Sequence, residues 1–218
     1  DKKGYFQTEL DPILEKAKTR EEKLDKIFNF VKSSVKWNHN RGIYCAEGVR
    51  KAYTSKTGNV AEINLMLTAM LRYSGFKASP VLISTRENGI LASPSISAFD
   101  CVIVAVEENN EIILLDASEK FSTPNVLPFR DLNWFGRLIR EDRTSKEIDL
   151  MPNFLSEQVI SLQIDIDPKG IVIGKIRSQF LDHLALDFRS TNNLTSKDDY
   201  FEQLEHNYNI EISDYDRD

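Results

Sequence analysis

The sequence predicts an α+β fold in which a central buried helix packs on an antiparallel sheet and a small β-rich segment follows. Three observations favour this fold class. The stretch between Asn59 and Gly75 is apolar around most of a helical circumference, which is typical of a buried helix. Hydrophobic runs at 78–85, 99–106 and 111–115 then read as strands. Helical patterns precede the central helix.

The N-terminal part is predicted to be helical. Residues 1–18 are expected to form a leading helix in whose first turn Pro12 is tolerated. Thr19 and Glu22 have the spacing of a capping box, which opens an amphipathic helix. The apolar face of that helix contains Leu24, Ile27, Phe28, Val31 and Val35. Its charged residues are interpreted as a solvated face. A short helix over 45–53 is expected to lead the chain to Gly58.

Local signals bound the central helix and the strands after it. Asn59 is a good N-cap, and Glu62 stands where its side chain can complete a second capping box. Gly75 supplies the left-handed residue that ends many helices. The pair Asn109–Asn110 predicts a tight hairpin between the second and third strands, because Asn tolerates positive φ.

Two domains are predicted, over residues 1–150 and 151–218. The boundary is placed within 140–152, which is charged and ends at a proline. Beyond it, residues 159–166 alternate as a half-buried strand and 171–176 return as its partner.

The second domain looks like the start of a longer C-terminal domain. Ser196 can cap a final helix that runs to about His206, and residues 210–212 are compatible with one more strand. We therefore expect a β-hairpin plus one helix here.

Composition excludes some partner classes. The chain has 218 residues, is 41% hydrophobic and has a net charge of −6, as an ordinary globular chain does. This charge, without a cluster of Lys or Arg, argues against a nucleic-acid partner. No apolar run approaches the ~20 residues of a membrane span. A start at Asp1, without a methionine or an apolar leader, is compatible with a fragment of a longer protein.

Cysteine and histidine spacing gives little sign of a metal. Cys45 and Cys101 either form one disulfide in an exported protein or are two buried free thiols, and we favour free thiols. The histidines are far apart and show no zinc-type spacing. The run 165–170 superficially resembles a calcium loop, but its fifth position is Lys169, its twelfth is Ile176 and strands flank it. We predict no metal and no cofactor.

Five motifs, in this order, resemble the transglutaminase-like superfamily. They are GNVAEIN at 58–64, GFKA at 75–78, PVLISTR at 80–86, FDC at 99–101 and LLDA at 114–117. More narrowly, the chain is similar to the transglutaminase-like domain of large exported bacterial proteins whose flanking domains are of unknown function.

The resemblance covers roughly residues 20–145 well and 158–218 more loosely. It implies a fold of the papain-like cysteine protease type and flanking domains in a longer protein. It also implies export to the periplasm or cell envelope, although the composition alone fits the cytoplasm equally well.

The resemblance also implies a degenerate catalytic triad. In active members a cysteine opens the central helix, a histidine lies on the next paired strand and an aspartate follows on its neighbour. Position by position, these roles fall on Val60, Cys101 and Asp116. Valine has no nucleophilic atom, and a cysteine cannot replace an imidazole as a proton shuttle near neutral pH. A shift of one residue does not restore the triad, because Asn59 and Ala61 are inert. The resemblance therefore implies the fold without the reaction.

Five residues are candidates for ligand binding: Trp37, His39, Asn59, Arg86 and Asp116. The resemblance places the loop of Trp37 and His39 near the cleft. Alternatively, Trp37 anchors this loop and His39 is simply exposed. Arg86 is the charged anchor of a polar loop at 86–97, which either borders a groove or has no function. Asp116 is expected to be retained for hydrogen bonding.

The aromatic pair Trp134 and Phe135 is expected to pack over the sheet, and an aromatic wall of a groove is the alternative.

Two function classes remain open. The first is a non-catalytic module of a cell-envelope protein, which holds a peptide, protein or glycan through the old cleft. The second is a cysteine-dependent hydrolase or acyl transferase with a relocated site, in which Cys101 attacks and His39 or Asp116 assists. The second requires an exposed Cys101 with a lowered pKa. A spacer without a ligand differs from the first class only in lacking a partner.

Overall fold

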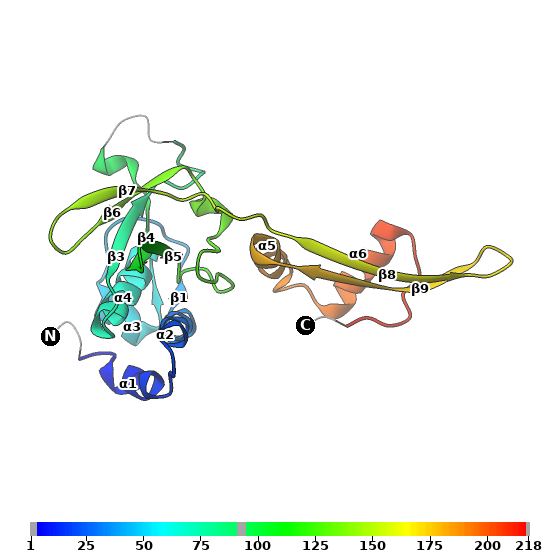
Figure 1. Cartoon of the computed structure of the whole chain (residues 1–218), viewed down its shortest axis with the longest axis horizontal. Helices are drawn as coiled ribbons and strands as arrows, with labels where there is room; N and C mark the ends of the chain where they lie inside the picture. Colours follow the sequence, from blue (N-terminus) through cyan, green and yellow to red (C-terminus); the bar gives the residue numbers. More distant parts are fainter. Residues whose placement is uncertain (1–3, 91–94, 217–218) are drawn as a thin grey trace. The chain divides into compact units, whose positions relative to one another are not determined.

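The chain consists of two units that meet between Leu155 and Ser156 (Figure 1). A computed structural model describes residues 4–90 and 95–216. The boundary predicted from the sequence, after residue 150, falls in a charged stretch that also contains the last strand of the first unit, Ser145–Asp149.

Three helices precede the central one in the first unit. They are α1 (Gln7–Glu15), α2 (Arg20–Ser34) and α3 (Val49–Ser55). The predicted apolar face of α2 is confirmed, since Leu24, Ile27, Phe28 and Val31 are buried. Its predicted capping box is only half formed: Thr19 Oγ1 accepts from the Glu22 amide at 3.1 Å, but the Glu22 carboxylate accepts from Lys18.

Two helix starts differ from the expectation. Helix α1 begins at Gln7, so Pro12 lies inside it and not in its first turn. Helix α3 begins at Val49 and not at Cys45, because Gly48 adopts a left-handed φ of 96° just before it.

The central helix α4 (Val60–Tyr73) is capped as predicted. Asn59 Oδ1 accepts from the Glu62 amide at 2.8 Å, and Glu62 Oε2 accepts from the Asn59 amide at 2.9 Å. The other Glu62 oxygen accepts from the amides of Glu47 at 2.7 Å and Gly48 at 2.8 Å. Burial alone would raise the pKa of Glu62, but these backbone hydrogen bonds bring it below its usual value. One carboxylate thus holds the loop before α3 against the start of α4.

Helix α4 packs on a five-stranded antiparallel sheet of order β5-β4-β3-β6-β7 (Figure 1). Its strands are β3 (Ala78–Ile83), β4 (Cys101–Glu108), β5 (Glu111–Leu115), β6 (Phe135–Ile139) and β7 (Ser145–Asp149). A short parallel pair joins β1 (Lys36–Trp37) to β2 (Thr57–Gly58). Two 3₁₀ turns are η1 (Ile96–Ala98) and η2 (Phe129–Asp131).

The sheet confirms the α+β class and the three predicted strands. The hairpin between β4 and β5 is also confirmed, with Asn109 and Asn110 at positive φ values of 51° and 65°. Strands β6 and β7 were missed, because β7 is an edge strand in which only Ile148 is buried and no alternation shows in the sequence. The expectation that Trp134 and Phe135 pack over the sheet is wrong, since they are 56% and 44% exposed.

The second unit is a β-hairpin followed by two helices. Strands β8 (Gln158–Ile166) and β9 (Val172–Phe180) pair in antiparallel register. Helices α5 (Asp182–Asn192) and α6 (Lys197–Tyr208) follow them. The Ser196 cap of α6 is confirmed, since its side chain accepts from the Asp199 amide at 3.0 Å. Helix α5 was missed, and residues 210–212 form no strand.

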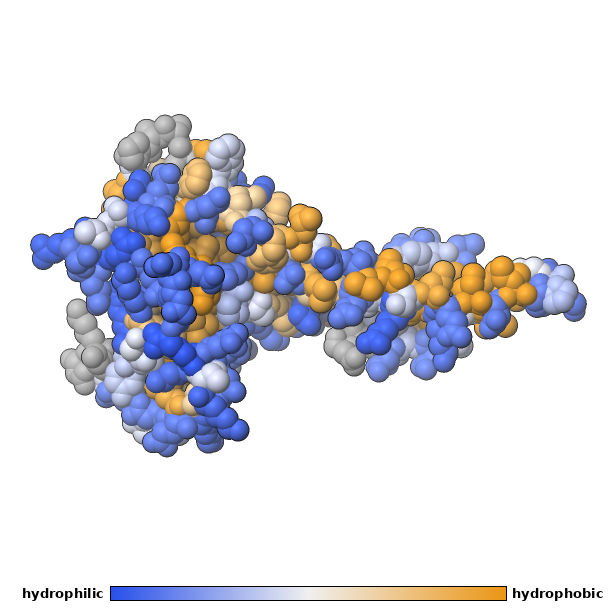
Figure 2. Space-filling model, in the orientation of Figure 1, coloured by the Kyte–Doolittle hydropathy of each residue, from blue (hydrophilic) through white to orange (hydrophobic). Residues whose placement is uncertain are grey.

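One face of the β8–β9 hairpin is apolar and exposed. Register pairs Leu162 with Ile176 and Ile166 with Val172, so alternate residues share this face. Its members are Ile160, Leu162, Ile164, Ile166, Val172 and Ile176, each between 47% and 65% exposed. Figure 2 shows them as a row of apolar colour along the hairpin. A two-stranded sheet is marginally stable alone, so this unit depends on contacts beyond the hairpin itself.

A single buried amide joins α4 to two strands. Asn64 Nδ2 donates to the Val102 carbonyl at 2.8 Å and to Asp116 Oδ1 at 2.7 Å. Its Oδ1 accepts from the Ala117 amide at 2.9 Å. Asn64 therefore connects the first turns of α4 with β4 and with the chain just after β5.

Asn64→Ala should lower the free energy of unfolding of the first unit by about 3 kcal/mol or more. Three buried groups lose a partner, at roughly 1–3 kcal/mol each. Thr68→Val is the matched control, because the Thr68 hydroxyl bonds only within α4, to the Asn64 carbonyl at 2.8 Å. It should cost less than about 1 kcal/mol. Urea unfolding measures both values, and equal losses would contradict the connecting role of Asn64.

Candidate functional site

The three triad positions converge near the start of α4. Val60 is the first residue of α4, Cys101 the first of β4, and Asp116 follows β5. Val60 and Cys101 belong to one buried apolar cluster, and Asn64 reaches from α4 to Asp116. Val60, Cys101 and Asp116 are all 0% exposed. The structure thus brings the three positions together but leaves none of them open to solvent.

Cys101 is a sealed thiol. Burial raises its pKa well above the usual value, and the nearby carboxyl groups of Asp131 and Asp116 raise it further. Its Sγ makes only a 3.9 Å contact with the Val102 carbonyl. A reactive thiol needs an electropositive and partly open environment, so Cys101 lacks the conditions for a nucleophile. Both Cys101 and Cys45 are free thiols, as favoured from the sequence.

Asp116 forms a buried ion pair with Arg130. Its Oδ2 lies 2.7 Å from Arg130 Nη2, and the Ser118 hydroxyl donates to its Oδ1 at 2.7 Å. Burial alone would raise the pKa of Asp116, but the Arg130 charge and the hydrogen bonds from Asn64 and Ser118 hold it below the usual value. Asp116 is therefore an ionised carboxylate with all its partners inside the protein, which supports the predicted hydrogen-bonding role.

Arg130 is the residue of this site that sequence reasoning missed. It comes from η2, and its side chain is 15% exposed. Its guanidinium lies 4.7 Å from the Trp37 ring centre and 3.4 Å from the Glu119 carboxylate. Burial alone would lower its pKa, but the carboxylates around it, Asp116 foremost, raise the pKa above its usual value. An arginine in a proline-bounded loop carries no sequence signal of such burial.

Asp131 is a second buried acid beside this ion pair. Burial and the Asp116 charge raise its pKa well above the usual value, although Arg130 opposes them. Within the described part of the chain, neither oxygen of Asp131 accepts a hydrogen bond, as a carboxylate would require. In its protonated form the acid is itself a donor to Asp116. Arg130 Nε lies 3.6 Å from Asp131 Oδ1, so this ion pair opposes the burial that raises the Asp131 pKa.

Residues 127–133, which we call the closing segment, cover the triad positions. Leu127 and Leu132 pack in the cluster of Val60 and Cys101. The segment is tied to the neighbouring loop, because the Arg130 backbone carbonyl accepts from the Arg86 backbone amide at 2.9 Å. The site is consequently a filled interior and not an open cleft.

Trp37 and His39 lie at the outer side of this interior. The Trp37 indole donates to the Asn40 carbonyl at 3.0 Å, which supports the interpretation that Trp37 anchors its loop. Its ring centre lies 4.9 Å from that of His39. His39 is exposed and has a positive φ of 66°. A histidine at the surface does not reach the sealed Cys101.

Asn59 and Arg86 are placed differently from each other. The Asn59 side chain accepts from Glu62 and donates to the Tyr44 carbonyl at 2.9 Å, so it serves as a cap. The Arg86 guanidinium stacks over the Phe129 ring at 4.2 Å. Of the predicted loop at 86–97, residues 91–94 lie outside the described residues.

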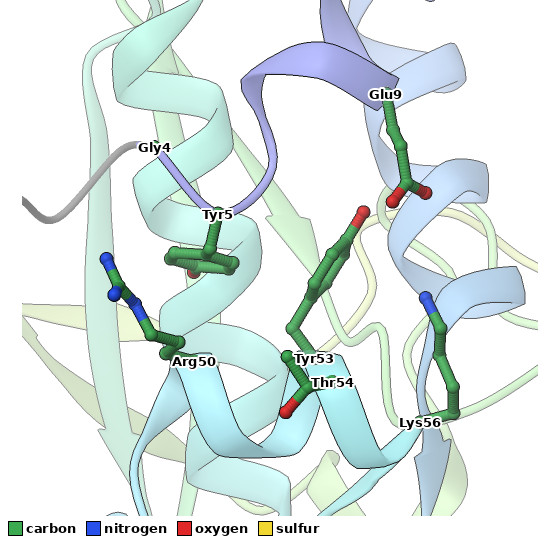
Figure 3. Close-up of a pocket in the computed structure, with 7 residues that line it drawn as sticks. All are labelled: Gly4, Tyr5, Glu9, Arg50, Tyr53, Thr54 and Lys56. Atoms are coloured by element: carbon green, nitrogen blue, oxygen red, sulfur yellow. The ribbon is translucent and has the colours of Figure 1, made fainter.

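A shallow depression of about 610 Å³ contains none of these residues. It lies between α1 and α3 (Figure 3) and is lined by Gly4, Tyr5, Glu9, Arg50, Tyr53, Thr54 and Lys56. Lys56 Nζ stacks over the Tyr53 ring at 4.4 Å, and the Tyr53 hydroxyl points toward Glu9. Burial raises the pKa of Tyr5 to about 12. These contacts describe packing of the N-terminal helices, apart from the triad positions.

Over residues 4–90 and 95–216, no three His, Cys, Asp or Glu side chains gather as they would around a metal ion. Within the same residues, every helix is too short or too polar to cross a membrane.

Residues 8–109 match the family model described as "Transglutaminase-like superfamily". The match confirms the resemblance inferred from the motifs. No curated protein matches the sequence.

Two solved structures are similar to the chain. One is a candidate protease from Parabacteroides distasonis, with a TM-score of 0.51 and 13% identity, covering 90% of this chain and 54% of that one. The other is a candidate cysteine protease from Cytophaga hutchinsonii, with a TM-score of 0.43 and 11% identity, covering 82% and 52%. The chain thus spans about half the length of each. At 13% identity, the first likeness concerns the fold alone.

Asp131→Asn should remove a decline of stability with pH. The folded chain holds the Asp131 proton more tightly than the unfolded chain, in which an Asp has a pKa of about 3.9. Stability therefore falls as pH rises from about 4 toward the raised pKa of the folded state. The uncharged Asn should abolish this decline and make the variant more stable at pH 7, by at least about 1 kcal/mol.

Urea unfolding of both proteins from pH 4 to 8 measures this difference. Asp116 does not interfere, because its lowered pKa gives stability that is present above about pH 4 and lost as pH falls further. A difference in stability that stays constant across the range would show that Asp131 does not titrate as described.

Proposed function

We propose that this chain, whose residues 8–109 match the transglutaminase-like superfamily, is a non-catalytic module of a bacterial cell-envelope protein. It holds a peptide, protein or glycan partner at the surface beside the degenerate triad and does not turn it over. The location in the periplasm or cell envelope follows from the resemblance to exported bacterial proteins. The proposal includes flanking domains in a longer protein, as the resemblance implies.

The filled triad carries the proposal that the module is non-catalytic. The helix start offers Val60 where a thiolate is needed, and the three positions are 0% exposed. Arg130 neutralises Asp116, and a guanidinium stays protonated at all relevant pH values. Proton relay through Asp116 therefore has no working partner.

The alternative, a relocated cysteine site, meets two physical obstacles. It needs Cys101 to be exposed with a lowered pKa, whereas Cys101 is fully buried and its pKa is raised. It also needs His39 or Asp116 as a base, whereas His39 lies at the surface and Asp116 is locked to Arg130. Attack by Cys101 would require the closing segment to leave.

In this proposal the partner binds to the side chains that are exposed beside the triad positions. The stack of Arg130, Trp37 and His39 ends in an exposed imidazole. Beside it, the exposed end of the Arg41–Glu87 ion pair (2.7 Å) adds charges of both signs. An aromatic face with flanking polar groups suits a peptide or a sugar ring.

Alkylation of the thiols against pH tests the non-catalytic assignment. In the folded chain, Cys101 should label only at the rate at which the unit opens, because its thiol is sealed. Cys45 is half-buried and its pKa is raised by burial, so its labelling should increase only above the usual thiol pKa of ~8.5. Peptide mass spectrometry reads both sites.

The matched variant for this experiment is His39→Ala. It should leave both labelling rates unchanged. Fast labelling of Cys101 well below pH 8.5 that disappears in His39→Ala would establish the relocated enzyme and overturn the proposal.

Fluorescence of Trp37 tests partner binding. Trp37 and Trp134 are the two tryptophans of the chain, so Trp134→Phe leaves Trp37 as the single reporter. Soluble peptidoglycan fragments and short peptides are the probes. Binding beside the triad should shift the Trp37 emission, and His39→Ala should weaken it about tenfold, a loss of roughly 1.4 kcal/mol.

Tyr44→Ala is the control for that titration, because the Tyr44 side chain is 70% exposed and is not part of the Trp37–His39 ring pair. It should leave the affinity unchanged. Probes of both classes that leave Trp37 emission unaltered would contradict a binding surface at this place.

A further inference from the structure

The closing segment turns aromatic side chains outward. Its inner side chains, Leu132 and Asp131, are buried, whereas Phe129 is 70% exposed. The residues just after it, Trp134 and Phe135, are 56% and 44% exposed. The same stretch of chain thus seals the triad on one side and presents large apolar groups on the other.

Hydrogen bonds tie the stretches that carry these side chains to the loop of Arg86: the Arg86 backbone N–H donates to the Arg130 carbonyl at 2.9 Å, and Asn133 Nδ2 donates to the Thr85 carbonyl at 3.3 Å. The rings of Trp134 and Phe135 are 6.5 Å apart in an edge-to-face arrangement. The Leu150 amide donates to the Trp134 carbonyl at 2.8 Å, which brings Met151, 45% exposed, next to Trp134. We call Phe129, Trp134, Phe135 and Met151 the aromatic surface.

Trp134 is held in an unfavourable backbone conformation. Its φ is 59°, in the left-handed region that bulky residues rarely adopt. The residue before it is anchored, since the Asn133 side-chain Nδ2 donates to the carbonyls of Ser84 at 3.0 Å and Gly89 at 2.9 Å. An exposed indole gains little packing in return for this strain. Strain that the surroundings impose on an exposed residue is typical of functional positions.

A cation lies at one edge of the aromatic surface. Arg86 stacks on Phe129 at 4.2 Å, and no carboxylate of residues 4–90 and 95–216 forms an ion pair with it. The arginines around it differ: Arg41 pairs with Glu87 at 2.7 Å, and Arg137 lies 3.8 Å from Glu147. The carboxylate nearest in sequence to Met151 is engaged locally, since Asp149 Oδ1 accepts from the Met151 backbone amide at 2.9 Å. The charge that a partner meets next to Phe129 is therefore positive.

We propose that the aromatic surface docks a protein partner, which packs a large apolar side chain beside Trp134 and sets a carboxylate against Arg86. Trp, Phe, Met and Arg are the residue types that protein–protein interfaces enrich, and Trp and Arg dominate their hot spots. The rigid, pre-set indole lowers the ordering cost of binding. This surface goes beyond the binding proposed at Trp37 and His39 and does not depend on it.

Selection from a displayed library of random peptides on the whole chain tests the proposal. Selected peptides should share an aromatic or large aliphatic residue close to Asp or Glu. Trp134→Ala should weaken their binding by at least about tenfold. Arg86→Gln should weaken the acidic peptides and leave versions with Asn or Gln in place of the acid unaffected. Tyr44→Ala, which removes another exposed aromatic ring, should change nothing.

A second variant separates docking from a structural role. Trp134→Gly removes the indole and relieves the left-handed strain, so it should abolish binding while keeping or raising the melting temperature. A lowered melting temperature would show that Trp134 supports the fold instead, and would overturn the proposal.

Other outcomes would also overturn it. These are a selection that yields no peptide, peptides insensitive to Trp134→Ala, and soluble peptidoglycan fragments binding in their place. Self-association in sedimentation that Trp134→Ala removes would identify a second copy as the occupant. Peptides whose binding is lost in His39→Ala but not in Trp134→Ala would refute this surface and support the site at Trp37. A reactive Cys101 would refute only the non-catalytic assignment.

Discussion

The position of α4 rests on two buried polar side chains, Glu62 and Asn64. Glu62 gathers backbone amides from the loop before α3 and from its own cap. Asn64 reaches β4 and the chain after β5. Leaving either side chain without hydrogen-bond partners in the interior would cost free energy. The start of α4 is therefore held where both side chains reach their partners. Residue 60 contributes nothing to these bonds through its side chain. The frame of the site can therefore persist with a valine where chemistry would need a thiol.

In the filled interior, too, buried polar groups are paired with partners inside the protein. An aspartate that orients an imidazole must leave that ring free to gain and lose a proton. Arg130 gives Asp116 a partner that never titrates and converts the carboxylate into a fixed charge. A second ionised acid there would repel the first, and this repulsion together with burial raises the pKa of Asp131. The result is a closed network that stabilises the end of the sheet.

Local chemistry and the burial of periodic apolar faces were predictable from the sequence, but the burial or exposure of single residues outside such patterns was not. The caps at Asn59 and Ser196 and the turn at Asn109–Asn110 depend on neighbouring residues only, and all three form. Arg130 escaped prediction because its burial depends on chain segments distant in sequence, Trp37 and Asp116 among them. Trp134 is predicted to pack over the sheet, but its backbone has a positive φ of 59° and its side chain is 56% exposed. Asn59 was expected to bind a ligand, although its amide is engaged as a cap.

Because the β8–β9 hairpin exposes an apolar face, the stability of the second unit should depend on the concentration of whatever covers that face. Any surface that covers Leu162 and its neighbours binds the folded hairpin and not the unfolded chain. Such binding adds RT ln(1 + [L]/Kd) to stability, roughly 2.7 kcal/mol when the covering surface is present at 100 times its Kd. For a two-stranded sheet this is a large fraction of the total. The melting point of this unit should therefore rise with the concentration of any surface that covers this face.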